Sequence, residues 1–127
     1  MNRSTEPVVH EGKTFTNVDY SERQLENKEF TKCIFENCDF SKSDLSYNTF
    51  VDCQFNACNF SLVVIDGTQL QNIRFTGCKL LGVNFSKADK LMFSFMFEDC
   101  IMDYSSFFGR KLRKTKFRNC SLKEVDL

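Results

Sequence analysis

The chain has 127 residues, a length that suits one domain. It contains fifteen Phe, no Trp and one Pro, so a folded form must bury many aromatic rings in an ordered way. Seventeen basic and seventeen acidic residues give a formal net charge of zero, which excludes a strong overall attraction to nucleic acid or to an acidic membrane.

The N-terminal segment is polar over residues 1–10 and lacks the apolar core of a signal peptide. No segment of the sequence approaches the roughly 18 apolar residues of a membrane helix, so we expect a cytoplasmic protein without a membrane partner. Residues 1–28 are expected to form a partly irregular cap. The reason is that Lys13, Arg23 and Lys28 occupy inward positions of the repeat described next, where unpaired charges are rarely buried.

A five-residue repeat begins at Phe15. Every fifth residue from there is large and apolar or aromatic, a period that matches neither a helix nor a strand. These centres are Phe15, Tyr20, Leu25, Phe30, Phe35, Phe40, Leu45, Phe50, Phe55, Phe60, Ile65, Leu70, Phe75, Leu80 and Phe85. The regularity predicts a solenoid.

A second inward position lies two residues before each centre. From Cys33 onward it is mostly small or β-branched, whereas the residues after each centre are mostly polar and turn-forming. A five-residue unit cannot bury a ring alone, so the units must stack. If four units close one coil of about 20 residues, neighbouring coils pair at about 4.8 Å, and Phe35, Phe55 and Phe75 lie in one column.

The period breaks after Phe85, because the next position in phase is Lys90. It resumes in a new phase with Phe97, Met102, Phe107, Leu112, Phe117, Leu122 and Leu127 as centres. The gap holds two residues more than two whole units. We therefore expect a bulge or short loop over residues 88–92 that locally swells the solenoid. Arg110 is an exception among the small inward residues of the second phase.

Units such as Cys38-Asp39-Phe40-Ser41-Lys42 and Val83-Asn84-Phe85-Ser86-Lys87 resemble the motif of the pentapeptide repeat family. The resemblance covers residues 13–127. It implies an all-β fold, a right-handed quadrilateral β-helix of about five to six coils, with residues 1–127 as one domain. The repeat is still in phase at Leu127. Either the sequence is truncated there, or another copy covers the open C-terminal coil and forms a homodimer.

Seven cysteines are the most obvious candidate ligands, and all of them fall at the small inward position. They are Cys33, Cys38, Cys53, Cys58, Cys78, Cys100 and Cys120. We favour packing over metal or redox chemistry, because a compact apolar side chain is needed there in any case. The single histidine, His10, lies in the polar N-terminal segment and is not expected to be catalytic. We predict no enzyme activity, no cofactor and no metal.

Charge is divided unevenly along the chain. Residues 1–60 contain six basic and ten acidic residues, whereas residues 61–127 contain eleven and seven. The candidate partner contact combines a basic segment with apolar residues in outward phases: Met96, Ile101, Tyr104, Phe108, Arg110, Lys111, Arg113, Lys114, Lys116 and Arg118. The alternatives are a solvated end face for the basic residues and burial under the bulge for the apolar ones. No outward aromatic residue interleaves with the basic segment, because Phe117 is an inward centre, so nucleic acid is not the expected partner.

We interpret the chain as a non-enzymatic scaffold that binds a protein partner whose identity the sequence does not give. The alternative follows from a more distant resemblance to the quinolone-resistance pentapeptide proteins, which mimic DNA and bind gyrase. DNA mimicry requires a strongly acidic surface, whereas this chain is neutral overall and basic in its C-terminal half.

Overall fold

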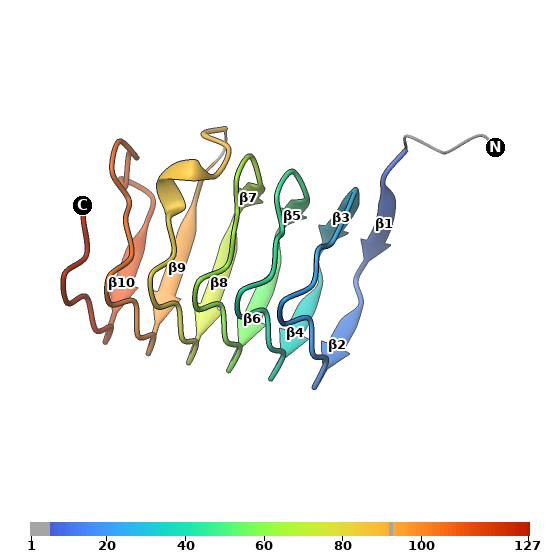
Figure 1. Ribbon diagram of the computed structural model, residues 1–127, viewed down its shortest axis with the longest axis horizontal. Helices are drawn as coiled ribbons and strands as arrows, with labels where there is room; N and C mark the ends of the chain where they lie inside the picture. The colour runs from blue at the N-terminus through green and yellow to red at the C-terminus, as the bar shows by residue number, and fades with distance from the viewer. Residues whose placement is uncertain (1–5, 92) are drawn as a thin grey trace.

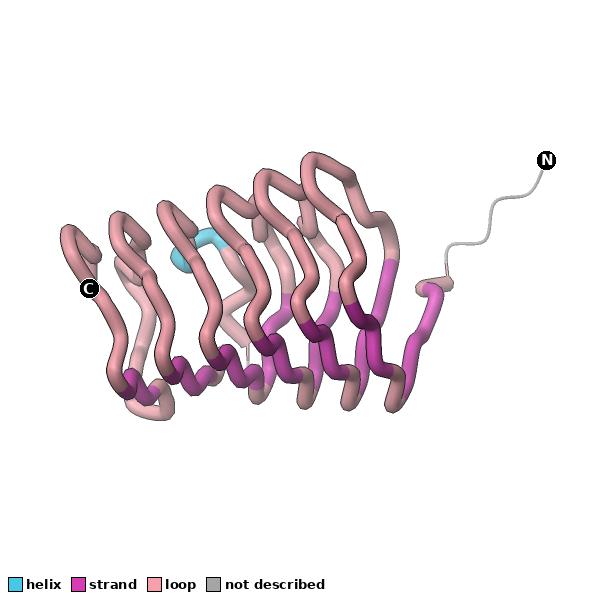
Figure 2. Tube along the Cα trace, turned by 90° about the horizontal axis from the view of Figure 1, so that it is seen from below, coloured by secondary structure: helices cyan, strands magenta, loops and turns pink. Residues whose placement is uncertain are grey.

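Each five-residue unit forms one side of a four-sided coil in the computed structural model, which describes residues 6–91 and 93–127. Six coils stack side by side into a parallel β-solenoid (Figures 1 and 2). The stack confirms the solenoid that the period predicts and the all-β fold of about five to six coils that the family resemblance implies.

Two of the four sides are parallel sheets. Sheet A contains β1 (Val8–Glu11), β3 (Lys28–Thr31), β5 (Thr49–Val51) and β7 (Gln69–Gln71). Sheet B contains β2 (Thr14–Thr16), β4 (Ile34–Glu36), β6 (Gln54–Asn56), β8 (Ile73–Thr76), β9 (Phe95–Glu98) and β10 (Lys116–Arg118). The register is 20 residues per coil up to β8, as in the pairing of Phe35 with Phe55.

The other two sides are held by single parallel bridges. Side C is centred on Phe40 and Phe60 and includes the bridge between Asp39 and Asn59. Side D is centred on Leu45 and Ile65 and includes the bridge between Asp44 and Val64. A short 3₁₀ helix, η1 (Phe85–Lys87), occupies side D of the fourth coil. Among the described residues, no helix is long and apolar enough to cross a membrane.

Left-handed backbone conformations mark the corners of the coil. Among residues 6–91 and 93–127, fifteen non-glycine residues and all five glycines have positive φ, nearly all at intervals of five. At one such corner Lys42 has φ +57°, and Ser43 N donates to Phe40 O at 3.0 Å, as in a type II turn. Asn, Asp and Gly are frequent at the corners because they adopt this conformation at the lowest steric cost.

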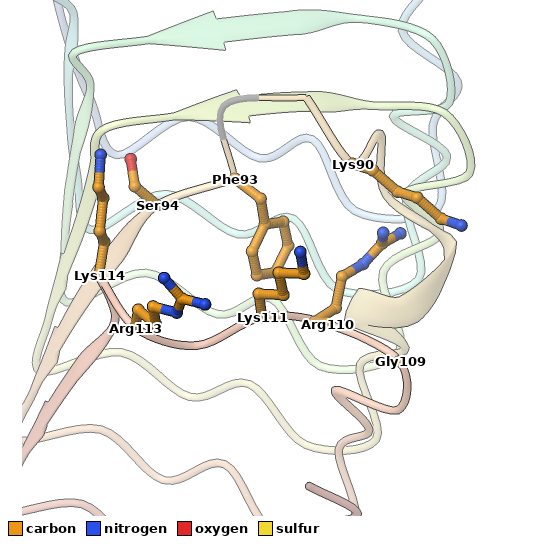
Figure 3. A pocket seen from close by; sticks show the side chains of 8 residues that line it. All are labelled: Lys90, Phe93, Ser94, Gly109, Arg110, Lys111, Arg113 and Lys114. Atoms are coloured by element: carbon orange, nitrogen blue, oxygen red, sulfur yellow. The ribbon is translucent and has the colours of Figure 1, made fainter.

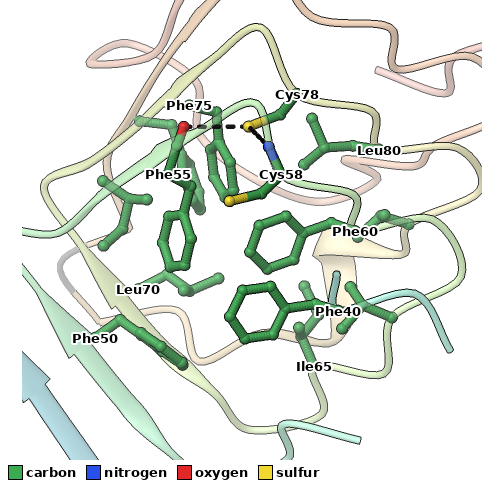
Figure 4. Close-up of a cluster of buried hydrophobic side chains, with 14 of the residues drawn as sticks. Phe40, Phe50, Phe55, Cys58, Phe60, Ile65, Leu70, Phe75, Cys78 and Leu80 are labelled. Carbon is green, nitrogen blue, oxygen red and sulfur yellow. Dashed lines mark hydrogen bonds between the residues drawn. The ribbon is translucent and has the colours of Figure 1, made fainter. Parts of the chain in front are cut away.

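The large inward residues form the predicted columns in the core (Figure 4). The Phe55 ring stacks between Phe35 and Phe75, with centroids at 4.8 and 5.0 Å. It also meets Phe60 of the next side edge to face, at 4.8 Å and 86°. Stacking between coils and edge contacts within a coil are both favourable ring geometries, so the core accommodates closely packed rings around Phe55.

Where the small inward residue is a cysteine or Thr68, its side chain also donates a hydrogen bond to the preceding coil. Cys58 Sγ donates to Phe35 O at 3.4 Å, and Cys78 Sγ donates to Phe55 O at 3.1 Å. Thr68 Oγ1 makes the equivalent contact with Leu45 O at 2.8 Å. All seven cysteines are free thiols and six are buried, as expected for packing residues. Burial raises the pKa of the Cys53 thiol to about 12.

The first coil has a regular backbone, which differs from the partly irregular cap expected over residues 1–28; residues 1–5 lie outside the described part of the chain. Strand β1 pairs in register with β3, and β2 pairs with β4. Lys13 and Arg23 occupy inward positions but are exposed, because they lie at the end of the described stack. No charge is therefore buried there.

His10, in the polar N-terminal segment, lies at the end of the aromatic column of sheet A and is half-buried. Its ring stacks on Phe30 with centroids 5.0 Å apart. Burial, followed by the nearby charges of Lys13 and Lys28, lowers the pKa of His10. The ring therefore serves as a neutral end of the aromatic column.

Candidate functional site

The repeat breaks between Asp89 and Ser94. Asp89 N donates to Thr68 O at 2.9 Å in the register of the earlier coils. Across the break the offset between coils is 22 residues, as in the pairing of Ile73 with Phe95, and it returns to 20 residues between β9 and β10. Two additional residues thus enter at the fifth crossing of sheet A, in agreement with the break expected at residues 88–92. Met92, the last residue of that expected range, lies outside the described residues.

Arg110 fills the small inward position in the coil that follows this break. Its Nε donates to Phe85 O at 3.1 Å and its Nη2 donates to Ser86 O at 2.6 Å and to Ala88 O. These oxygens belong to η1 and its C-terminal end. Desolvation lowers the pKa of Arg110, although the charge of nearby Asp89 opposes this effect. The arginine that breaks the small-residue pattern is therefore the side chain that satisfies the backbone of the break.

A groove of about 630 Å³ lies between the break and the last coil (Figure 3). The break contributes Lys90, Phe93 and Ser94, and the last coil contributes a glycine and four cations. The residues from the last coil are Gly109, Arg110, Lys111, Arg113 and Lys114. The Phe93 ring lies between these two banks, with the Arg110 guanidinium carbon 5.3 Å from its centroid.

The groove is strongly positive. Within residues 6–91 and 93–127, none of its five cations has an acidic side chain at salt-bridge distance. Arg118, outside the groove on β10, does form such a pair with Glu98 at 3.5 Å. The groove therefore concentrates uncompensated positive charge in a chain whose net charge is zero.

The ten predicted contact residues do not form one surface. Arg110, Lys111, Arg113 and Lys114 line the groove, whereas Lys116 and Arg118 lie on β10 in sheet B. Met96 is half-buried on β9, where it pairs with Lys116. The remaining three residues, Ile101, Tyr104 and Phe108, are exposed on sides C and D. The break does not bury them.

Sides C and D, with their corners, carry most of the exposed large apolar residues. This apolar surface consists of Tyr47, Leu62, Val64, Ile101, Tyr104 and Phe108. Leu62 extends over Gly82 of the next coil, where an added Cβ would lie 2.9 Å from Leu62 Cδ2. Tyr104 occupies the same corner one coil further on. An apolar column thus crosses the register break along one edge of the solenoid.

Sequence reasoning identified only part of the groove and only part of the apolar surface. Phe93 supplies the aromatic side chain that the basic segment lacks in sequence, because the break brings the ring beside Arg110. Lys90 was recognised only as a residue that cannot be a buried centre. Tyr47, Leu62 and Val64 are not among the predicted contact residues, because Leu62 and Tyr104 share a column only when the two extra residues of the break are counted.

Comparison with known proteins decides the family. Residues 28–95 and 49–127 match the model of the pentapeptide repeat region, so the matches together span residues 28–127. The chain belongs to the pentapeptide repeat family. No curated protein sequence matches this pentapeptide repeat chain.

One solved structure supports the fold, and a second shows a weaker similarity. The pentapeptide repeat protein Rfr23 from the cyanobacterium Cyanothece 51142 aligns with a TM-score of 0.57 at 14% identity, over 93% of this chain and 90% of that one. QnrB1, a plasmid-mediated fluoroquinolone resistance protein, aligns with a TM-score of 0.49 at 17% identity. That alignment covers 92% of this chain and 59% of QnrB1, so the chain spans well under two thirds of QnrB1's length.

Proposed function

We propose that the protein is a non-enzymatic scaffold that binds a protein partner through the apolar surface on sides C and D. One observation carries this proposal. Leu62 and Tyr104 are 54% and 67% exposed in one corner column, and Ile101, three residues before Tyr104, is 46% exposed. Grouped exposed apolar side chains on a soluble protein are typical of interaction sites.

The backbone beneath these residues supports the proposal. Leu62 N donates to Leu81 O at 2.9 Å, and Tyr104 N donates to Lys123 O at 2.9 Å, so both corners are tied to the following coil. A partner would meet a surface that is already ordered, which reduces the conformational entropy lost on binding. Aromatic residues such as Tyr104 and Phe108 are enriched in protein interfaces.

The cysteines bear on the compartment. Seven free thiols on a small domain are typical of a reducing environment rather than a secretory one. They support the cytoplasmic location that we propose for the protein.

The DNA-mimicry alternative is disfavoured by charge. A mimic of DNA needs rows of carboxylates along the rod, whereas residues 61–127 carry eleven basic and seven acidic residues. Five of those cations gather in the groove. We therefore place gyrase binding second to the scaffold function.

Site-specific crosslinking tests the scaffold proposal. A photo-crosslinking amino acid at position 104 should capture one defined protein in the native host, whereas the same amino acid at Gln54, exposed on sheet B, should not. The captured protein is then purified and titrated with the scaffold. Equal capture at both positions, or none at position 104, would contradict the proposal.

Matched variants make the titration decisive. Leu62→Asn/Tyr104→Asn removes two apolar side chains, and Asn tolerates the positive φ of both corners. Its affinity for the captured protein should fall at least about tenfold, or roughly 1.4 kcal/mol. Val8→Thr/Val9→Thr removes two exposed apolar side chains from sheet A and should leave the affinity unchanged.

A further inference from the structure

The groove below the repeat break has the dimensions of a small-molecule site. Its volume of about 630 Å³ falls within the range of about 300–1,000 Å³ that is common for such pockets. The two banks come from different coils, the break on one side and residues 109–114 on the other (Figure 3). A ligand that fills the groove therefore touches both coils.

The cations in the groove favour a compact ligand with several negative charges. Arg110 is committed to the backbone of the break, which leaves Lys90, Lys111, Arg113 and Lys114 free to bind. These four groups share one small volume. A peptide strand advances about 3.3 Å per residue with side chains on alternating faces, so it presents few carboxylates to such a volume. A chain of linked phosphates presents three or four negative charges there.

The Phe93 ring adds a flat apolar contact to this charged site. Arg110 approaches the ring at 5.3 Å, and Phe95 packs against it edge to face with centroids 4.5 Å apart. Both contacts fix the ring in the groove between the cations (Figure 3). A planar base can stack on such a ring with little specificity for sequence.

We propose that this groove binds a nucleoside polyphosphate. Lys90, Lys111, Arg113 and Lys114 hold the phosphates, Phe93 contacts the base, and Arg110 positions Phe93 while it secures the break. The proposal goes beyond the scaffold function, because the groove lies beside the repeat break whereas Leu62 and Tyr104 lie at the corner between sides C and D. Ligand binding would tie the last coil to the break and so couple a small molecule to the order of that end.

Calorimetric titration tests the proposal directly. The full chain is titrated at low ionic strength, without divalent cations, with ATP, inorganic tripolyphosphate and AMP. ATP should bind with one site per chain and at least about tenfold more tightly than AMP, because it carries more charge. Phe93→Leu should weaken ATP binding but leave tripolyphosphate binding within about twofold.

Charge-reversal variants provide the control. Lys111→Glu/Lys114→Glu changes two exposed groove residues and should weaken ATP binding at least about tenfold. Lys116→Glu/Lys123→Glu makes the same charge change outside the groove, also at exposed positions, and should weaken it by less than about threefold. Far-ultraviolet circular dichroism confirms that each variant is folded.

Three outcomes would overturn the proposal. The first is the absence of ATP binding, or equal affinity for ATP and AMP. The second is an equal loss of affinity in the two charge-reversal variants. The third is a single-stranded oligonucleotide that binds through the same residues roughly a hundredfold more tightly than ATP, which would identify a nucleic-acid site. The apolar-surface variant Leu62→Asn/Tyr104→Asn should bind ATP normally, so this test fails or succeeds independently of the scaffold proposal.

Discussion

Arg110 Nε lies 3.1 Å from the main-chain oxygen of Phe85 in the coil above it. Ser105 makes the same contact with Leu80 O at 2.7 Å, and Cys100 makes it with Phe75 O at 3.5 Å. Arg110 thus donates the same hydrogen bond to the preceding coil that Ser105 and Cys100 donate from the equivalent position. Its additional length reaches into the space opened by the two extra residues. The break and Arg110 are therefore one structural unit.

The aromatic column makes a prediction about stability. Phe55 is buried and contacts Phe35, Phe75 and Phe60. Phe55→Ala should lower the free energy of unfolding by about 3–5 kcal/mol, since it leaves a cavity that the stacked rings cannot close. Lys42→Ala, at an exposed corner, should change it by less than about 0.5 kcal/mol. Urea denaturation measures both. A loss below about 1 kcal/mol for Phe55→Ala would mean that the column does not support the fold.

The buried thiols predict a loss of stability in alkali. The pKa of Cys53 is raised to about 12 in the folded chain, above the value of about 8.5 for an unperturbed thiol. The neutral thiol is therefore favoured by folding, and its contribution is complete below about pH 8.5. It falls as pH rises towards 12, because only the unfolded chain has released the proton.

Denaturation at several pH values tests this sign. Cys53→Ser retains a donor at this position but does not ionise, so its unfolding free energy should decline less steeply above about pH 9 than that of the parent chain. Identical slopes would show that Cys53 titrates normally.

Cys120, which is only half-buried, should be the first thiol to react with an alkylating reagent.

The corner ladder of asparagines offers a stabilising change. Asn37 Nδ2 donates to Asn17 Oδ1 at 2.8 Å, and Ala57 occupies the same corner in the next coil with φ +52°. Ala57→Asn should extend this ladder and relieve backbone strain, which would raise the free energy of unfolding by about 0.5–1 kcal/mol. Ala57→Asp, which introduces an acceptor in place of the amide donor, is the control and should gain less. A decrease with Asn would contradict the corner geometry.

The charge distribution predicts the result of a gyrase assay. Supercoiling by gyrase in the presence of a quinolone should not be restored by this protein, even in large excess, because the basic groove and net-neutral chain lack the continuous carboxylate surface of a DNA mimic. Restoration of supercoiling at stoichiometric protein would favour the alternative function over the scaffold.

The regular part of the fold could be predicted from sequence because one rule repeats in every coil. Phe15 to Phe85 in steps of five determined the columns, and the position of Lys90 located the break. The described part of the first coil is more regular than its inward residues suggest, for a physical reason. Lys13 and Arg23 violate the inward pattern, but at the end of the described stack their side chains reach solvent, so the backbone remains regular.

The candidate sites could not be predicted in the same way, because they depend on contacts between coils. The four cations of residues 110–114 were visible in the sequence, but Phe93 lies far from them along the chain and reaches them only through the break. The set of ten contact residues likewise divided among the sides of the coil, since residues close in sequence turn a corner every five positions.

A double-mutant cycle tests most directly whether the break and Arg110 form one unit. Arg110→Ser is measured by urea denaturation in the parent chain and in a chain from which Lys90 and Leu91 have been deleted. In the parent, the substitution should cost about 1–3 kcal/mol, because main-chain oxygens of Phe85, Ser86 and Ala88 lose their donor. In the deleted chain the regular coil is restored and serine should suffice, so the cost should fall below about 0.5 kcal/mol. Equal costs in both backgrounds would contradict the coupling on which the groove depends.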